Sequence, residues 1–356
     1  MKSIVRRTAL AVCTLVLAVI LPTAASAACT GFDDVPESAD CYESVMYLAK
    51  CEIVAGMGNE CFSPEQLITV EQWAVMLCRA YGVETIGDSW QDVGRSGVVE
   101  AYLQGWLNET ALSVPRSPMC RSVLVESTFA AADVPVYDST LYEGETSLST
   151  ADNILRVGRE LGLCSDDTDT NALVTRGEAA IILHAVLTQS FHVEEPPAPV
   201  TMVNAAGVNV NDFLLELRKV PEQVLDAFNA TGWTYCIDFD YMGGLSKKLN
   251  MSCIGATNYS RKTIYISEAD ATLHEFGHFL DYALGFPAEH ERLYLAESQN
   301  SSLRDYAKTN SREFFADCFV HWITYSADKK RMDDFRDAAP QTYAYMKKLA
   351  TNNWGA

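Results

Sequence analysis

The segment His274-Glu275-Phe276-Gly277-His278 holds two imidazoles and a carboxylate at a spacing that suits metal chemistry. A helix places residues four apart on one face, so both imidazoles can reach a single ion. Glu275 stands beside them, where it can hold a water molecule and take its proton. This pattern predicts a zinc-dependent hydrolase, provided that a third metal ligand lies elsewhere in the chain.

The helix expected over residues 273–284 has two distinct faces when it is projected at about 100° per residue. The histidines lie on the polar face with Glu275. The apolar residues gather on the opposite face: Leu273, Phe276, Phe279, Leu280, Ala283 and Leu284. This division favours a helix packed on a core, with the histidines turned toward a site. The alternative is a surface helix with two solvated histidines.

A second helix, expected over residues 313–323 and beginning 35 residues beyond His278, offers the third ligand. Its polar side carries Glu313, Asp317 and His321, and its other side is aromatic. Glu313 is the leading candidate. However, Asn310 with Glu313 also fits a capping box, in which Glu313 would only bond the start of its own helix. The residues by themselves leave both roles open.

Other potential ligands lie nearby in the sequence. Glu289, His290 and Glu291 form a charged segment just after the first helix, and we expect this segment to be solvated. His321 is a rival ligand two turns into the second helix. Cys318 is turned about 140° from the start of that helix, so we expect it to pack in the core.

The first 27 residues have the pattern of a secretory signal peptide. Basic residues precede an apolar run and the small residues Ala25-Ser26-Ala27. We expect cleavage after Ala27, and the alternative is a lipidation signal that ends at Cys29. No other apolar run reaches the ~20 residues needed to cross a bilayer. The sequence therefore predicts a secreted, extracellular protein without a membrane span.

The chain beyond the signal peptide is acidic. Removing three of the 27 basic residues leaves 24 against 47 aspartates and glutamates, a net charge of -23. Such a surface repels phosphate backbones, so we expect no nucleic-acid partner.

Ten cysteines remain after cleavage, irregularly spaced and without a paired CxxC motif. Disulfides persist in exported proteins, so structural bridges are favoured over a thiolate metal site. Cys51 with Cys61 and Cys236 with Cys253 are the expected local pairs. The overall connectivity stays open.

Residues 28–192 read as three degenerate repeats of about 55 residues, each made of a helix, a turn and a helix. The first begins at Phe32-Asp33-Asp34-Val35, and the second begins at Trp90-Gln91-Asp92-Val93, 58 positions later. The third ends with Val174-Thr175-Arg176-Gly177-Glu178. Such units bury their apolar faces mainly against one another, which predicts a mainly α-helical repeat array.

These residues resemble the S-layer homology repeat, which attaches proteins to the cell wall of Gram-positive bacteria. The resemblance implies that this half binds a cell-wall polymer. The family's Thr-Arg segment is present as Thr175-Arg176 but is Thr69-Val70 in the first unit. The alternative is a purely structural array.

Residues 193–200 are rich in proline and predict an extended linker, after which the pattern changes. Residues 201–356 predict an α+β domain. We expect helices over 212–217 and 222–228, strands over 233–238 and 263–266, and a long polar loop over 241–260. The strand at 263–266 could pair with an extended substrate.

Three motifs of this domain, in order, resemble the catalytic domain of anthrax lethal factor and the related Pro-Pro endopeptidases. They are His274-Glu275-Phe276-Gly277-His278, Tyr306-Ala307-Lys308-Thr309-Asn310 and Glu313-Phe314-Phe315-Ala316-Asp317. The similarity covers roughly residues 205–350.

This resemblance implies a zincin-type metallopeptidase of the gluzincin class. His274, His278 and Glu313 would bind one Zn²⁺, Glu275 would act as general base, and Tyr306 would stabilise the oxyanion. Asp317, shorter than the glutamate often found at its position, would orient a metal ligand without touching the ion.

The sequence as a whole predicts a secreted zinc endopeptidase that acts on proteins or peptides and is associated with the wall of a Gram-positive bacterium. The resemblance adds proline-containing bonds, and Pro196-Pro197 raises the hypothesis that the linker itself is cut. One alternative is a catalytically inactive wall-binding or adhesion protein. Another is a different zinc hydrolysis, such as attack on a wall peptide cross-link.

Overall fold

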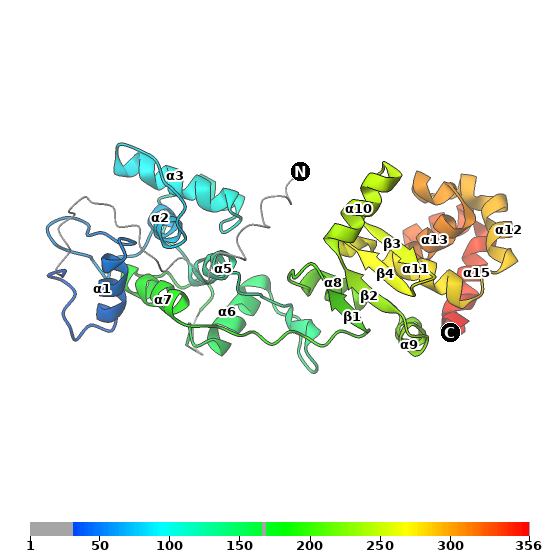
Figure 1. Cartoon of the computed structure of the whole chain (residues 1–356), viewed down its shortest axis with the longest axis horizontal. Helices are drawn as coiled ribbons and strands as arrows, with labels where there is room; N and C mark the ends of the chain where they lie inside the picture. Colours follow the sequence, from blue (N-terminus) through cyan, green and yellow to red (C-terminus); the bar gives the residue numbers. More distant parts are fainter. Residues whose placement is uncertain (1–30, 166–168, 356) are drawn as a thin grey trace. The chain divides into compact units, whose positions relative to one another are not determined.

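The structure, a computed structural model, describes residues 31–165 and 169–355 of the chain. The predicted signal peptide and its alternative at Cys29 lie outside these residues. The described chain divides into two compact units, whose helices and strands are labelled in Figure 1. Within the described residues, the N-terminal unit comprises residues 31–132 and 169–190, and the C-terminal unit comprises residues 133–165 and 191–355.

The N-terminal unit is helical. Thr69 and Thr175 cap two of its helices through capping boxes, in which each hydroxyl accepts a bond from the backbone three residues later. The helices are α1 (Tyr42–Lys50), α2 (Val70–Ala80), α3 (Trp90–Leu103), α4 (Glu109–Ser113), α5 (Arg121–Ala131) and α7 (Arg176–Thr188).

Three backbone segments meet in a ring before α2, α5 and α7. Ile68 N donates to Val174 O at 2.9 Å, Val174 N donates to Met119 O at 3.0 Å, and Met119 N donates to Ile68 O at 2.9 Å. Each of these residues stands two positions before its helix. Cys120 therefore occupies the N-cap position that threonine holds in the other two segments. Its side chain makes no cap bond.

Arg176, in the segment that resembles the wall-binding family, is buried with 4% of its surface exposed. Its Nε donates to Phe62 O at 2.9 Å, and its guanidinium lies 4.6 Å from the centre of the Phe62 ring. Burial lowers the pKa of Arg176 to about 10. This side chain fastens α7 to the loop before α2 and does not face the solvent.

The C-terminal unit contains a four-stranded sheet in the order β1-β2-β4-β3. β1 (Met202–Asn204), β2 (Thr234–Ile237) and β4 (Thr263–Ile266) are parallel, and β3 (Gly255–Asn258) pairs antiparallel with β4 at one edge. The strands predicted at 233–238 and 263–266 are confirmed. The idea that residues 263–266 pair with a substrate is wrong, because β2 and β3 occupy both edges of β4.

The polar loop predicted for residues 241–260 is also wrong. The segment holds most of α10 (Phe239–Leu249) and all of β3. The carboxylate of Asp238 accepts a hydrogen bond from Tyr241 N at 2.8 Å and so caps α10. The adjacent Gly243 and Gly244 lower the helix propensity of the segment and hide the helix from a sequence pattern. β3 exists only through its pairing with β4.

The remaining elements of the C-terminal unit are helices, so its class is α+β. The helices predicted at 212–217, 222–228, 273–284 and 313–323 are confirmed with small changes of length. The elements are η2 (Ser139–Leu141), α6 (Thr150–Glu160), α8 (Asn211–Leu217), α9 (Glu222–Ala230), η3 (Ala269–Ala271), α11 (Thr272–Ala283), α12 (Ala288–Glu297), η4 (Ser298–Asn300), η5 (Asp305–Lys308), α13 (Ser311–Tyr325), α14 (Lys329–Ala338), α15 (Pro340–Thr351) and η6 (Asn353–Gly355).

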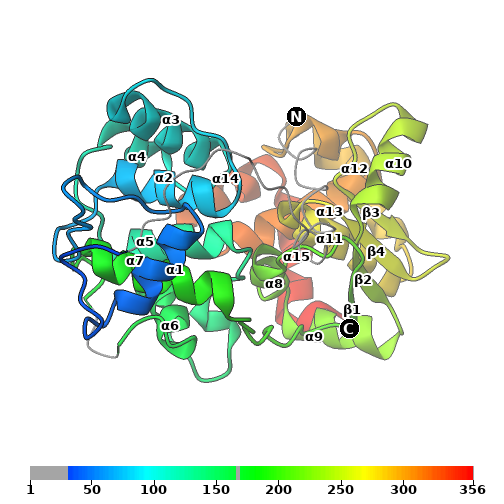
Figure 2. The same ribbon diagram turned by 60° about the vertical axis from the view of Figure 1, so that its left-hand side comes forward.

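Helices α11 and α13 lie side by side in both ribbon views (Figures 1 and 2). They come close together at Gly277, where an added Cβ would stand 2.7 Å from the Cα of Ala316. No larger residue fits there. On its other side α11 packs into an aromatic core, with the rings of Phe276 and Phe279 centred 4.9 and 5.1 Å from the ring of Phe228.

The core of the C-terminal unit includes residues from far earlier in the chain. Tyr137 and Leu141 are buried in it, with 4% and 1% of their surfaces exposed. Arg218 donates to Leu141 O at 2.6 Å, and Asp138 N donates to the side chain of Asn211 at 2.7 Å. The compact unit therefore begins well before residue 201, where the sequence predicts the domain to start.

The predicted linker also contacts this unit. Val193 and Ala198 pack against its core, and Tyr142 Oη donates to Glu194 O at 2.6 Å. Asn229 donates to Pro199 O at 2.9 Å. Residues 193–200, which the sequence predicts to be an extended linker, are thus held along a packed surface.

Cys51, Cys61, Cys236 and Cys253 carry free thiols, so neither predicted disulfide is formed. For the second pair the reason is the strand order. β4 separates the strand of Cys236 from the strand that follows Cys253. Two strand spacings of ~4.8 Å exceed the ~7 Å reach of a disulfide between Cα atoms.

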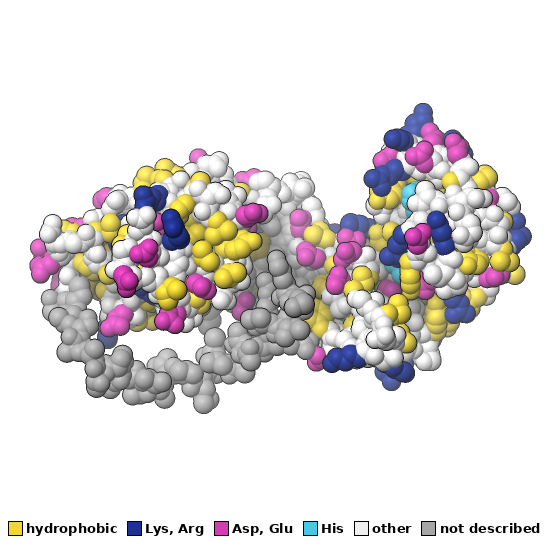
Figure 3. Space-filling model, turned by 90° about the horizontal axis from the view of Figure 1, so that it is seen from above, with side chains coloured by type: hydrophobic (Ala, Val, Ile, Leu, Met, Phe, Trp, Pro, Cys, Tyr) yellow, Lys and Arg dark blue, Asp and Glu magenta, His cyan; other side chains and the backbone are white. Residues whose placement is uncertain are grey.

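Among the described helices, none is long and apolar enough to cross a membrane. Acidic and basic side chains are interspersed on the visible face of each unit in Figure 3, with hydrophobic side chains between them. On this face the acidic excess of the sequence is spread out and does not form one patch.

Replacing Leu141 by alanine should destabilise the C-terminal unit by about 2–5 kcal/mol, because the buried side chain leaves a cavity in the shared core. Hydrogen exchange of the β2 amides reports the opening of this unit alone. The matched control is Leu295→Ala on α12, where the side chain is 73% exposed. Equal protection of the β2 amides in both variants would show that residues 133–165 do not support the fold.

Candidate metal centre

The two histidines and Glu313 meet between α11 and α13. His274 Nε2 lies 3.1 Å from His278 Nε2 and 2.9 Å from Glu313 Oε2, and His278 Nε2 lies 3.3 Å from the same oxygen. These are the one group of histidine, cysteine and acidic side chains among the described residues whose donor atoms lie close enough to hold one metal ion.

The geometry of this triangle fits zinc. Zinc-ligand bonds of about 2.0–2.1 Å in a tetrahedron place neighbouring donor atoms about 3.3 Å apart, and the observed separations are 2.9, 3.1 and 3.3 Å. Two imidazoles and one carboxylate also form a donor set that zinc prefers, with a fourth position left open. The residues present therefore fit the ion that the sequence predicts.

The site is buried, which makes its charges interdependent. His274 and His278 are 8% and 9% exposed. Burial lowers the pKa of His274, but its hydrogen bonds to Asp317 and Glu313 outweigh burial and raise the pKa to about 9. Burial favours the neutral form of Glu313, but bonds from both histidines hold its pKa well below the usual range. In the metal-free protein, a proton on His274 thus supplies the positive charge that a metal ion would supply.

The side chain of Asn310 bears on the two roles that the sequence leaves open for Glu313, metal ligand or helix cap. The side chain of Asn310 accepts bonds from the backbone N–H groups of Arg312 and Glu313 at 3.0 and 3.1 Å. Asn310 therefore caps α13 on its own. The carboxylate of Glu313, one turn inside the helix, points to the histidines.

Asp317 binds the ring nitrogen of His274 that does not face the candidate metal position. Its Oδ1 lies 2.8 Å from Nδ1 of His274, and the carboxylate is 5% exposed. A proton on Nδ1 that is donated to Asp317 leaves Nε2 with a lone pair for the ion. Arg304, which sequence reasoning missed, binds both oxygens of Asp317. Arg304 lies outside the helices, so no periodicity pointed to it.

Glu275 is held by strand β3 at the edge of the sheet. The hydroxyl of Thr257 donates to Oε2 of Glu275 at 2.7 Å. At Gly255 an added Cβ would stand 2.6 Å from Oε1 of Glu275, so only glycine leaves room for the carboxylate. Both residues fall in the segment that the sequence predicts to be a loop, and this is why they were missed.

Tyr306 lies on η5 beside the metal ligands. Its ring centre is 6.1 Å from the ring centre of His274, and the residue is 43% exposed. Burial of the hydroxyl and the charges of Glu313 and Glu275 raise the pKa of Tyr306 to about 12. The phenol therefore stays protonated at neutral pH and can donate a hydrogen bond.

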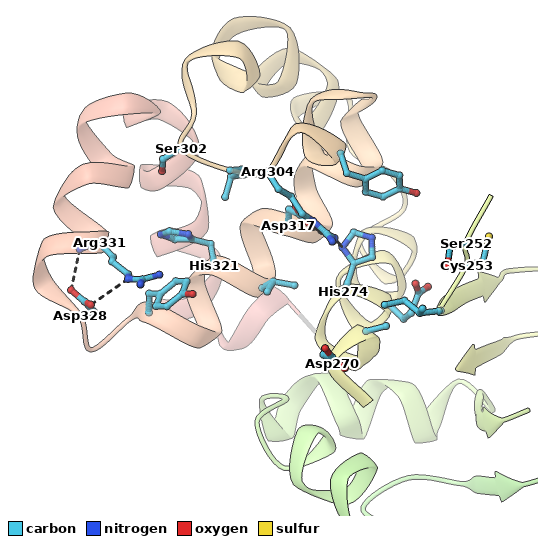
Figure 4. A pocket seen from close by; sticks show the side chains of 18 of the residues that line it. Ser252, Cys253, Asp270, His274, Ser302, Arg304, Asp317, His321, Asp328 and Arg331 are labelled. Atoms are coloured by element: carbon cyan, nitrogen blue, oxygen red, sulfur yellow. Dashed lines mark hydrogen bonds and ion pairs between the residues drawn. The ribbon is translucent and has the colours of Figure 1, made fainter. Parts of the chain in front are cut away.

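A cavity of about 970 Å³ opens beside these groups. It runs from Gly255 past His274 and Glu275 to Tyr325 and Arg331. Figure 4 shows His274, Asp317 and Arg304 together on its wall, with His321 and Arg331 further along and Ser252 and Cys253 at the other side.

The rival ligands lie apart from this centre. His290, predicted to be solvated, is 4% exposed and bonds Asp281 at 2.6 Å and Tyr345 at 2.9 Å. His321 lines the cavity without joining the triangle. Cys318 packs in the core as predicted.

Zinc affinity of the metal-free protein should rise with pH between 6.5 and about 9, because His274 holds a proton up to a pKa of about 9 and zinc binds only the neutral imidazole. Because zinc must displace this proton at neutral pH, the zinc affinity should rise by up to about tenfold per pH unit. Competition with a chromogenic chelator measures the affinity. His321→Ala should keep the slope and His274→Ala should lose it; a flat profile in the wild type would contradict the assignment.

Comparison with known families agrees with this geometry. Residues 215–349 match the model of "Anthrax toxin lethal factor, N- and C-terminal domain", and residues 31–72 match the model of the S-layer homology domain. The first match includes the two histidines and Glu313. A search of curated proteins gives no match to the chain. The chain is thus similar to the anthrax lethal factor domain family over residues 215–349 and to the S-layer homology domain over residues 31–72.

Proposed function

We propose that the C-terminal unit is a zinc-dependent endopeptidase. The observation that carries this proposal is the triangle of His274, His278 and Glu313, with Glu275 and Tyr306 beside it on one cavity. The lethal factor family, whose model this segment matches, is zinc-dependent. When bound, zinc would supply Lewis acidity to the scissile carbonyl and to a water at its open position.

The chain's own residues complete the reaction. Glu275, 2.7 Å from the hydroxyl of Thr257, takes a proton from the attacking water and passes it to the leaving amine. Tyr306, protonated at neutral pH, donates a hydrogen bond to the developing oxyanion, a contribution typically worth ~3–4 kcal/mol. Asp317 keeps the proton of His274 on Nδ1, so that Nε2 remains a ligand.

The substrate we propose is a protein or peptide in an extended conformation. β3 stands at the edge of the sheet and contacts Glu275, so an extended chain that pairs with its outer side lies along the catalytic groups. The resemblance to Pro-Pro endopeptidases extends the proposal to bonds next to proline. Cleavage of the chain's own linker is disfavoured, because residues 193–200 are bonded along the C-terminal unit.

We further propose that the N-terminal unit attaches the enzyme to the cell wall of a Gram-positive bacterium as an array of three repeats. Support comes from the S-layer homology match, which is typical of cell-surface proteins, and from the ring of equivalent segments before α2, α5 and α7. Since Arg176 is buried, residues other than Arg176 have to contact the polymer.

Replacing Glu275 by glutamine should lower kcat/KM by about 10²–10⁴, because the amide cannot accept the proton. Cleavage mapping against a whole proteome supplies the substrate peptide for the assay. Glu289→Gln, at an exposed ion pair with Arg292, is the control and should act like wild type. Zinc-dependent cleavage that is unchanged in Glu275→Gln would refute the peptidase, and zinc binding without any cleavage would favour the inactive wall-binding alternative.

Replacing Thr257 by valine should lower kcat/KM about 10- to 100-fold, since a hydrogen bond to a charged group contributes ~1.5–3 kcal/mol. Valine keeps the shape of the side chain and removes only the donor to Glu275. Thr263→Val is the matched control, because its hydroxyl donates only to Arg261 O on an exposed turn. Equal rates for the two variants would mean that Thr257 does not position Glu275.

A further inference from the structure

Arg304 and Asp317 form a two-pronged ion pair at the wall of the cavity. Nε of Arg304 donates to Oδ2 of Asp317 at 2.6 Å, and Nη2 donates to Oδ1 at 2.7 Å. The carboxylate is almost fully buried, whereas 56% of the Arg304 side chain is exposed. A planar guanidinium that donates hydrogen bonds to both carboxylate oxygens fixes the plane of the carboxylate as well as its position.

The fixed carboxylate is the one that bonds His274. Oδ1 of Asp317 accepts from both Arg304 and Nδ1 of His274, which lies 2.8 Å away. The two donor nitrogens are 3.0 Å apart, so the three groups form one tight cluster. Without the guanidinium, Oδ2 would be left without a partner in a buried place, and the carboxylate would gain by turning toward water. His274 would then lose its acceptor.

The other histidine has no such support. Within the described residues, Nδ1 of His278 is buried without a hydrogen-bond partner. Within the described residues, His274 is therefore the one of these two histidines whose Nδ1 is held by a chain of hydrogen bonds, which runs from Arg304 through Asp317. Arg304 also immediately precedes η5, and its guanidinium lies 5.4 Å from the ring centre of Tyr306.

We propose that Arg304 is a positioning residue of this site. Its guanidinium binds both oxygens of Asp317 and fixes that carboxylate, so that His274 directs Nε2 toward the metal. Arg304 itself contacts neither the metal nor the reacting atoms. The proposal rests on the metal site of the proposed function. Residues that orient a metal ligand from behind typically change metal affinity 10- to 100-fold when they are lost.

The test measures zinc affinity of the full chain by competition with a chelator, together with the visible spectrum of the cobalt-substituted protein, which reports ligand geometry. Arg304→Ala should weaken zinc binding about 10- to 100-fold and alter the cobalt spectrum. Arg304→Lys keeps the charge but not the fork and should fall between wild type and Arg304→Ala. Arg336→Ala, at an exposed ion pair with Asp333 on α14, should match wild type.

A double-mutant cycle shows whether Arg304 acts through Asp317. Asp317→Asn keeps the shape of the side chain and removes the charge that Arg304 binds. If Arg304 acts only through Asp317, Arg304→Ala should weaken zinc binding no further in the Asp317→Asn background. Full additivity of the two losses would overturn the proposal.

Other outcomes are equally decisive. Unchanged zinc affinity in both Arg304→Ala and Arg304→Lys would overturn the proposal that Arg304 positions the site. A variant in which only KM rises would also overturn it, because Arg304 would then contact the substrate. If metal-free Arg304→Ala fails to fold, Arg304→Lys decides, since its melting temperature and zinc affinity are measured on the same sample. A wild type that binds no zinc would refute the metal site of the proposed function itself, which separates that failure from failure of the role of Arg304.

Discussion

The close approach of α11 and α13 at Gly277 is the contact on which the site depends. Because Gly277 has no side chain, the backbone of α13 at Ala316 lies where a Cβ would otherwise stand. Three positions before Ala316 on α13 lies Glu313, and on α11 the histidines flank Gly277. At this separation donor atoms from both helices meet within 3.3 Å. A wider spacing would leave two histidines and a carboxylate without a common centre.

This short separation between the helices brings ionisable groups together in a buried place. Each buried charge must therefore be offset by hydrogen bonds or by an opposite charge. Glu313 stays charged because both histidines bond it, and Asp317 stays charged because His274 and Arg304 bond it, with its pKa held below the usual value despite burial. The cluster is thus organised for a cation in its centre. The sheet contributes Gly255 and Thr257 of β3, which contact the carboxylate of Glu275.

The unit that carries the site is stabilised by parts of the chain that a domain boundary at residue 201 would exclude. Tyr137 and Leu141 complete its core, and the proline-rich segment lies against it. The two segments that match family models lie in different compact units, but the units are not consecutive along the chain. Residues 133–165, which lie between these two segments, pack with the C-terminal unit.

Much of the site was determined by the sequence alone. The spacing of His274 and His278 follows from the helical repeat, and the two-faced pattern around them requires a packed helix. Glu313 could be named as a candidate third ligand from its helix and from the family resemblance, and the side chain of Asn310, which caps α13 by itself, favours that role over a capping role. Arg304, Thr257 and the strand β3 were decided only by tertiary structure. Their positions depend on ion pairing and strand pairing between different elements, which leave no periodicity within either element. Gly277 has a low helix propensity, and its role becomes visible only when the helix that packs against it is present.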